Sequence, residues 1–260
     1  MSLKDCKDIV SEVIKYQIEK YKINLNIKKI RKDKIMEERW NSRTEILIGK
    51  QGIEKLEKAK IIIYGIGGVG SYTTELLARA GIGNIVLVDN DIISKSNINR
   101  QIHATTKTVG KNKVDVMKIR IKEINPNIKI ETYMKEEQEE NLIKEDFTYV
   151  VDAVDTIKTK IKLVEKANQI GVPIISAMGA GNKLDPTKFE VSDIYKTSEC
   201  PIAKILRKEL KKRNIKKLKV VYSKEKAIAN PNNIIGSVSF VPSAMGTIIA
   251  GEVIKDIINK

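Results

Sequence analysis

The segment 60–101 constrains the fold more than any other part of this chain. A run of β-branched isoleucines leads directly into the glycine turn GIGGVG at residues 65–70. A helix-compatible segment (71–80) follows, and a second apolar run (85–88) ends in Asp89. Strand, glycine turn, helix, strand and acidic tip in this order predict a βαβ unit that binds a nucleotide.

The glycines of the turn have distinct expected roles. Gly65 permits a sharp turn, Gly67 lets backbone amides approach a phosphate, and Gly70 allows close contact between helix and strand. The helix N-terminus adds partial positive charge for an anion. Asp89 is placed to accept hydrogen bonds from ribose hydroxyls. Gly81, at the end of the helical segment, is expected to form a left-handed cap.

The residues after this unit favour a triphosphate over NAD, which shares the ribose-binding acid. Asn97 and Arg100 lie on the loop beyond the strand tip, where they can reach phosphates. Lys113, at the start of the next helix, can neutralise phosphate charge. Asp155, at the end of the strand expected over 148–154, is a carboxylate suited to Mg²⁺. We therefore expect an ATP site.

Composition restricts the class of protein and its compartment. The 260 residues are 42% hydrophobic and 31% charged, as in a globular domain. No apolar run approaches the roughly 18 residues of a membrane helix, so no integral membrane association is expected. The first residues carry charges where a signal peptide needs an apolar core. Only Cys6 and Cys200 occur, which excludes a disulfide framework and a four-thiolate zinc site. We expect a cytoplasmic protein without zinc.

The pattern predicts a doubly wound, mostly parallel α/β sheet. Residues 1–38 read as an amphipathic helix, with Ile9, Val13, Ile14, Ile18 and Tyr21 at helical spacing, followed by a charged linker. The main domain, 39–260, alternates strands near 60–64, 84–88, 128–133, 148–154 and 173–177 with helices near 70–80, 111–124, 138–144 and 157–169. The domain also contains a crossover insertion at about 181–235, which has strand-like pieces at 189–195 and 218–222. It ends in a C-terminal helix at 242–258.

The charge balance points to a polyanionic partner at one segment. Lys+Arg 48 against Asp+Glu 33 gives a net charge of +15, most of which is expected to be solvated lysine. The exception is residues 204–219, KILRKELKKRNIKKLK, with Glu209 as the only acid. Clustered cations of this kind gain from counterion release on a phosphate backbone. The candidate contacts, on a basic helix, are Lys204, Arg207, Lys208, Lys211, Lys212 and Arg213, with Lys216, Lys217 and Lys219 beyond.

Four motifs resemble the ubiquitin-activating-enzyme-like family of ATP-dependent adenylating enzymes. They are GIGGVGSYTTELLARAGIGNIVLVDND, SNINRQ, GKNKVDVM and VVDAVDTIKTK. The resemblance covers about 39–260 and implies a Rossmann-like adenylation domain and a homodimer. It implies that an arginine of the lead-in segment, Arg43 or alternatively Arg39, reaches the partner's phosphates. It also implies ATP or magnesium contacts from Gly65, Gly67, Gly68, Gly70, Asp89, Asp91, Asn97, Arg100, Gln101, Lys113 and Asp155.

Departures from the family pattern narrow the substrate. Relatives that activate sulfur carriers usually hold zinc through two CxxC pairs, which this chain lacks. The segments at 78–83, 99–104 and 179–223 resemble the branch that adenylates threonylcarbamoyladenosine in tRNA and closes it into a ring. The first rival is adenylation of the C-terminal glycine of a ubiquitin-like sulfur carrier, and the second is a nucleotide- and RNA-binding protein without turnover. The sequence also leaves open whether a monovalent cation binds and whether a sulfur-acceptor or cysteine desulfurase system docks on the protein.

The remaining reactive side chains carry weaker expectations. Cys200 lies where relatives form a thioester, and Lys204 nearby could lower its pKa. The alternative is a helix-start residue before Pro201, which we favour because an intramolecular ring closure needs no covalent enzyme intermediate. His103 is expected to be a structural, hydrogen-bonded residue. Asp152 is expected to orient the strand end. Cys6 and Trp40 carry no functional prediction.

Overall fold

The computed structural model describes residues 12, 14–22, 39–134, 139–229 and 234–259, in two units. The first unit covers residues 1–46 and the second residues 47–260. Residues 14–22 are helical, which confirms that part of the predicted N-terminal helix. Ile9 and Val13 of the same prediction, and Cys6, lie outside the described residues. Helix α2 (Ser42–Lys58) begins in the first unit, continues in the second and is kinked at Gly49.

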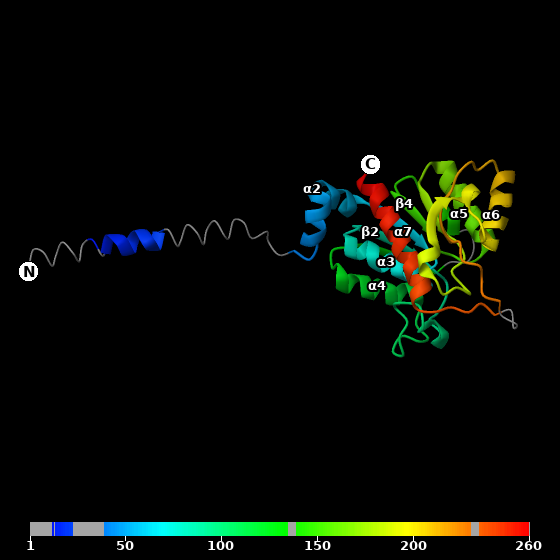
Figure 1. The fold of residues 1–260 in the computed structure, drawn as a ribbon, viewed down its shortest axis with the longest axis horizontal. Helices are drawn as coiled ribbons and strands as arrows, with labels where there is room; N and C mark the ends of the chain where they lie inside the picture. The colour runs from blue at the N-terminus through cyan, green and yellow to red at the C-terminus, as the bar shows by residue number, and fades with distance from the viewer. Residues whose placement is uncertain (1–11, 13, 23–38, 135–138, 230–233, 260) are drawn as a thin grey trace, which may run out of the picture. The chain divides into compact units, whose positions relative to one another are not determined.

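The second unit contains a seven-stranded sheet in the order β3-β2-β1-β4-β5-β7-β6. Figure 1 labels β2 and β4 of this sheet, with helices around it. All neighbouring pairs are parallel except β6 and β7, which are antiparallel. The predicted mostly parallel α/β sheet is therefore confirmed. The strands are β1 (Lys60–Tyr64), β2 (Asn84–Val88), β3 (Lys129–Tyr133), β4 (Tyr149–Asp152), β5 (Ile174–Ala177), β6 (Phe189–Asp193) and β7 (Lys219–Ser223).

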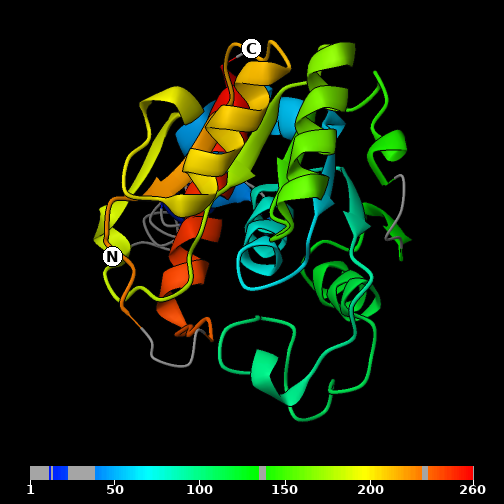
Figure 2. The same cartoon turned by 90° about the vertical axis from the view of Figure 1, so that its right-hand side faces the viewer.

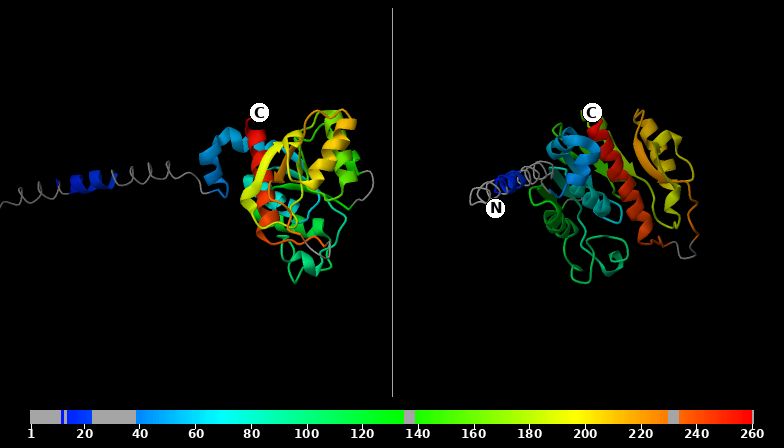
Figure 3. Two further views of the ribbon diagram at one scale, coloured as in Figure 1. Left: turned by 45° about the vertical axis from the view of Figure 1, so that its right-hand side comes forward. Right: turned by 60° about the vertical axis from the view of Figure 1, so that its left-hand side comes forward.

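Helices cover both faces of the sheet. α3 (Gly70–Ala80), α4 (Lys113–Ile124) and α7 (Phe240–Ile258) share one hydrophobic cluster with the sheet, and α3 lies alongside α7 (Figure 3). On the opposite face, α5 (Ile157–Ile170) and α6 (Pro201–Lys212) lie side by side (Figure 2). None of the described helices is long and apolar enough to cross a membrane.

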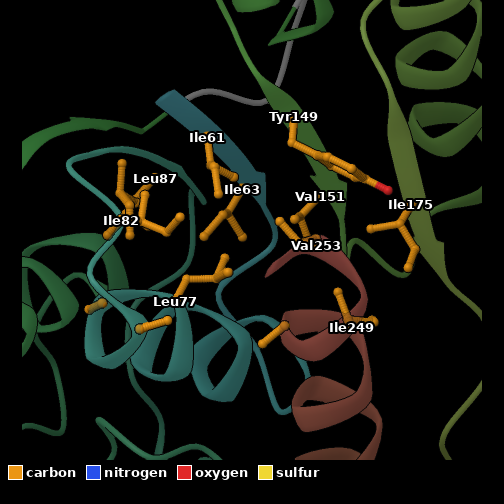
Figure 4. Packing of buried hydrophobic residues seen from close by; sticks show 14 of the residues in the cluster. Ile61, Ile63, Leu77, Ile82, Leu87, Tyr149, Val151, Ile175, Ile249 and Val253 are labelled. Carbon is orange, nitrogen blue, oxygen red and sulfur yellow. The ribbon is translucent and has the colours of Figure 1, made fainter. Parts of the chain in front are cut away.

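Strand alternation explains the two layers. Successive residues of β1 point to opposite faces, so Ile61 and Ile63 pack on the α3 side, as Figure 4 shows, while Ile62 packs on the α5 side. All three are fully buried because both faces are covered by helices. Gly81 caps α3 with φ 100°, as the sequence predicted.

Two predicted elements are wrong in extent or type. In place of the helix expected at 138–144 the structure has the short 3₁₀ helix η2 (Glu139–Leu142), with residue 138 outside the described part. β6 stops at Asp193, because the Asp193 carboxylate accepts the Tyr195 amide and starts the 3₁₀ helix η4 (Ile194–Lys196). The predicted basic helix is present as α6, which ends at Lys212, before Asn214 with φ 57°.

Candidate active site

The predicted nucleotide residues gather at the carboxyl edge of the sheet, where the strand order reverses around β1. β1 pairs with β2 on one side and with β4 on the other. The connections that leave these two neighbours depart in opposite directions, and in doubly wound sheets ligands bind at such a point, beyond the carboxyl ends of the strands. The glycine turn, Asp89 and Asp155 all follow the carboxyl ends of these three strands.

Backbone geometry accounts for the glycine turn. Gly65 has φ 83°, donates its amide to Val88 O at 2.9 Å, and a Cβ there would lie 2.6 Å from Ala153 O. A Cβ on Gly70 would lie 1.8 Å from Gly65 O. Gly67 differs, since a Cβ there would meet only Gln101 Nε2, at 3.9 Å. The first and last glycines thus close the turn, and the middle one leaves space beside the backbone.

Asp89 holds the turn from the neighbouring strand. Its Oδ2 accepts the Ile66 amide at 2.5 Å and its Oδ1 accepts the Asp91 amide at 2.8 Å. Burial raises the pKa of the Asp89 carboxyl, and Lys113, with Nζ 3.8 Å from Oδ1, opposes that shift. Lys113 is itself buried and also binds Asp91 at 2.5 Å. Its charge is therefore positioned by two carboxylates at the mouth of the turn.

The loop after β2 brings three predicted side chains together. Asn97 ends the 3₁₀ helix η1 (Lys95–Asn97), and its Oδ1 accepts the Ser94 amide at 3.0 Å, which leaves the side-chain NH₂ available. Gln101 is buried, and its Oε1 has no hydrogen-bond partner among the described residues. Arg100 is held by Ser96 O at 2.8 Å and packs its Cγ against Gly68.

A buried ion pair at the end of β4 was missed by the sequence reasoning. Asp152 is fully buried, and Lys160 Nζ lies 3.1 Å from both of its carboxylate oxygens and 2.7 Å from Ala177 O. Asp152 Oδ1 also accepts the Val154 amide at 3.2 Å, which confirms that it orients the strand end. Lys160 thus connects the ends of β4 and β5. A signal was present, because Lys160 lies on the buried face of α5 with Val164 and Ala167.

Asp155 lies three residues beyond β4 and is exposed. Its Oδ1 accepts the Thr156 hydroxyl at 3.3 Å. The described residues contain no group of three or more His, Cys, Asp or Glu that could hold a metal ion by themselves. Mg²⁺ is usually held by one or two carboxylates together with substrate phosphates. A single exposed carboxylate therefore fits Mg²⁺ that arrives with a nucleotide.

A second acid near this edge was also missed. Glu139, in η2, has its pKa raised to about 7, first by burial and then by Glu140, Asp152 and Asp89, while a hydrogen bond from Thr159 opposes the shift. Its backbone oxygen accepts the Tyr64 hydroxyl at 2.9 Å. Little in the sequence indicates this raised pKa, since the shift depends on burial by residues distant in the chain.

His103 is buried as expected, but it is not hydrogen-bonded. Neither ring nitrogen has a hydrogen-bond partner within the described part of the chain. Burial, followed by the nearby charges of Lys113 and Arg120, lowers the His103 pKa to about 4. The predicted hydrogen-bonded role is therefore wrong, because the ring is enclosed beside two cations and no acceptor faces it.

His103 should remain neutral across the physiological pH range. Its folded pKa lies below the ordinary value of 6.5, so stability is full above about pH 6.5 and falls as the pH drops towards 4. The loss reaches about 3 kcal/mol. Because His103 is the only histidine, its imidazole NMR signal can be titrated directly. His103→Gln should remove this part of the pH dependence, and a midpoint near 6.5 would contradict the assignment.

Cys200 is buried and immediately precedes α6, with Pro201 at the first helical position. This placement confirms the helix-start alternative. Its Sγ lies 3.9 Å from the position a Cβ on Gly179 would take. Burial at this point leaves the thiol poorly placed for attack on a bound substrate.

Within the first unit, the two candidate arginines differ in their contacts. Arg39 forms an ion pair with Glu45. Arg43, in the first turn of α2, is exposed and has no hydrogen bond or ion pair among the described residues. Arg43 is therefore the side chain that is free to bind an external anion.

The fold and site define a nucleotide-binding α/β protein with its ligand edge above β1 and β4. The profile of the ThiF family matches residues 41–260, and the chain belongs to this family. It is 42% identical to the tRNA threonylcarbamoyladenosine dehydratase of Bacillus subtilis (strain 168) over 238 residues, 84% of this chain and 94% of that protein.

Solved structures of a tRNA threonylcarbamoyladenosine dehydratase are also similar to this chain. The crystal structure of the E. coli tRNA N6-threonylcarbamoyladenosine dehydratase in complex with AMP has a TM-score of 0.76 and 31% identity, and covers 84% of this chain and 93% of that one. The structure of that protein in complex with ATP has a TM-score of 0.75 and 32% identity, with the same coverage.

Proposed function

We propose that this chain is an ATP-dependent enzyme that adenylates the carboxylate of threonylcarbamoyladenosine in tRNA and then closes that side chain into a ring. The observation that carries this proposal is the site itself. The glycine turn, Asp89, Arg100 and Gln101 converge at one sheet edge, in a chain similar along nearly its whole length to a dehydratase of this modified nucleoside. The enzyme would work in the cytoplasm.

Each group at the edge has a role in binding ATP. The amides of the turn, Gly65 to Gly70, surround the phosphates, and Asp89 binds the ribose hydroxyls. Asn97 offers its free NH₂, and Gln101 offers a buried amide beside Gly67. Arg100 and Lys113 supply positive charge for the phosphates. Arg100 must leave Ser96 O to do so, which is feasible because its guanidinium lies at the surface.

Adenylation requires orientation and charge stabilisation more than proton transfer. A substrate carboxylate is already anionic at neutral pH, so its oxygen attacks the α-phosphorus without a general base, and pyrophosphate leaves. Arg100 and Lys113 stabilise the charge that develops on the leaving group. Asp155 would hold Mg²⁺ that arrives on the ATP phosphates, and that ion would neutralise further phosphate charge.

Ring closure needs no covalent bond to the enzyme. A nucleophile of the same modified nucleoside attacks the acyl adenylate and loses its proton, and AMP leaves with one former carboxylate oxygen. The nucleoside thus loses one water in total. The buried position of Cys200 agrees with this route, since no thioester is required.

A homodimer completes the proposed site. Arg43 of the partner subunit would reach the phosphates of the bound ATP, and the lack of a hydrogen bond or ion pair to Arg43 among the described residues supports its choice over Arg39. Binding of a monovalent cation and docking of a sulfur-acceptor or cysteine desulfurase system stay predictions.

The test supplies the purified protein with Mg-ATP and tRNA that bears threonylcarbamoyladenosine. We expect AMP release, and a nucleoside lighter by one water that forms only with ATP. A ubiquitin-like sulfur-carrier protein serves as the parallel substrate. AMP release with the carrier alone would assign the chain to sulfur activation, and ATP binding without pyrophosphate release would indicate a protein without turnover.

A further inference from the structure

We propose that helices α5 and α6 together form the surface that binds the phosphate backbone of the tRNA. This lysine surface consists of Lys158 and Lys166 on α5 and Lys204, Lys208 and Lys211 on α6. The inference rests on the proposed function for the identity of the RNA. It differs from the basic segment identified in the sequence in two ways. It includes lysines of a second helix, α5, and it leaves out the basic residues of the segment that are paired within the protein.

The two helices both begin at the nucleotide edge of the sheet. α5 starts two residues after Asp155. α6 starts at Pro201, next to Cys200, whose Sγ lies near Gly179 just beyond the carboxyl end of β5. The helices pack against each other and run side by side on the face turned to the viewer in Figure 2. A polyanion bound along them therefore extends up to the edge where ATP would bind.

Internal contacts reduce the six candidate residues of the basic segment to three. Arg207 donates to Thr197 O at 2.8 Å and so anchors the chain after η4. Lys212 pairs with Glu209 at 2.7 Å, and Arg213 pairs with the same carboxylate at 2.7 Å. The other three, Lys204, Lys208 and Lys211, are exposed and have no hydrogen bond or ion pair with any described residue.

The same criterion selects lysines on α5. Lys160 is buried against Asp152, and Lys162 pairs with Glu140 at 3.5 Å. Lys158, which is exposed, and Lys166, which is half-buried, have no such contact among the described residues. These two lysines lie eight residues apart on the same helical face, about 12 Å along the axis.

No free acid on either helix offsets these charges. Glu165 is the only acid of α5 and Glu209 the only acid of α6. Arg213 binds both, with Nε 3.0 Å from Glu165 and Nη1 2.7 Å from Glu209. Arg213 thus bridges the two helices, and together with Lys212 it pairs with both carboxylates. Within the two helices, no unpaired acid offsets the positive charge of the lysine surface, which favours attraction of a polyanion.

The spacing of the α6 lysines suits a run of phosphates. Lys204, Lys208 and Lys211 are at positions i, i+4 and i+7, so they lie on one face over about 10 Å. A strand of duplex nucleic acid carries a phosphate about every 3.4 Å of helix axis. One row of lysines can therefore neutralise several phosphates at once. Contacts of this kind position an RNA without reading its sequence.

The experiment measures binding of a tRNA transcript to the full-length protein between 50 and 200 mM salt. The α6 variant carries Lys204→Gln, Lys208→Gln and Lys211→Gln, and the α5 variant carries Lys158→Gln and Lys166→Gln. We expect the α6 variant to bind about tenfold more weakly, with its salt slope reduced by about one per lysine. The α5 variant should show a smaller loss of the same kind.

The matched control removes three exposed lysines outside the surface, through Lys58→Gln, Lys118→Gln and Lys129→Gln. It should bind tRNA nearly as the unchanged protein does. Equal binding by all three variants would overturn the proposal and return these lysines to solvated surface, or to a site for an acidic protein. An effect of the α6 variant alone would overturn the part assigned to α5. Failure of the unchanged protein to remove water from modified tRNA would contradict the proposed function and not the surface.

Discussion

Replacing Arg100 with alanine should lower ATP–pyrophosphate exchange by about a thousandfold while the melting temperature stays unchanged. A guanidinium aimed at the transferred phosphates contributes on the order of 10³ or more to the rate in comparable reactions. Among the described residues, the Arg100 head group forms hydrogen bonds only with Ser96 O and Asn99 Oδ1, near the surface. Its removal therefore leaves no buried group without a partner, and activity and stability can be separated.

The control for this variant is Lys107→Ala. Lys107 is an exposed cation on the same loop, and its side chain has no hydrogen bond or ion pair within the described residues. It should retain most of the exchange rate. Arg100→Lys should recover only part of the loss, because an ammonium lacks the planar, two-pronged geometry of the guanidinium. Exchange that survives in Arg100→Ala would show that this residue does not contact the phosphates.

The local parts of the fold could be predicted from the sequence because local chemistry determines them. The glycine turn has one plausible geometry, since a Cβ on Gly70 would collide with the Gly65 carbonyl. α3 ends at Gly81, which takes the left-handed cap conformation, and α4 ends before Asn125, because the residue before Pro126 is disfavoured in a helix. The placement of Asp89 follows directly, as it ends a strand beside that turn.

The rest of the site depends on what packs around each side chain, which the sequence does not state. Nothing in the local sequence distinguishes the charge of Lys160 from that of the other lysines, whereas in the structure Lys160 is fully buried against Asp152. His103 lacks its expected hydrogen bond because no described residue offers its ring a partner. The basic helix formed as predicted, but the sequence does not show that Glu209 binds two of its cations.

Replacing Lys160 with methionine should destabilise the protein by about 3–5 kcal/mol, because the Asp152 carboxylate would remain buried without its counter-charge. For a chain of this size that loss lowers the melting temperature by about 10 °C. The link from β4 to Ala177 O would be lost as well, so ATP affinity should fall with stability. Thermal unfolding of Lys160→Met and of Lys158→Met, an exposed lysine on the same helix, provides the comparison, and the second variant should unfold close to the unchanged protein.

The double variant Lys160→Met with Asp152→Asn separates the loss of the counter-charge from the loss of the hydrogen bond to Ala177 O. Asparagine keeps an oxygen for the Val154 amide but carries no charge, so most of the stability should return. ATP affinity need not return with it, because the link from Lys160 to Ala177 O would still be missing at the edge that positions Asp155. Recovery of both properties would mean that only the charge mattered. An undiminished melting temperature in Lys160→Met would show that the pair is not buried as the structure has it.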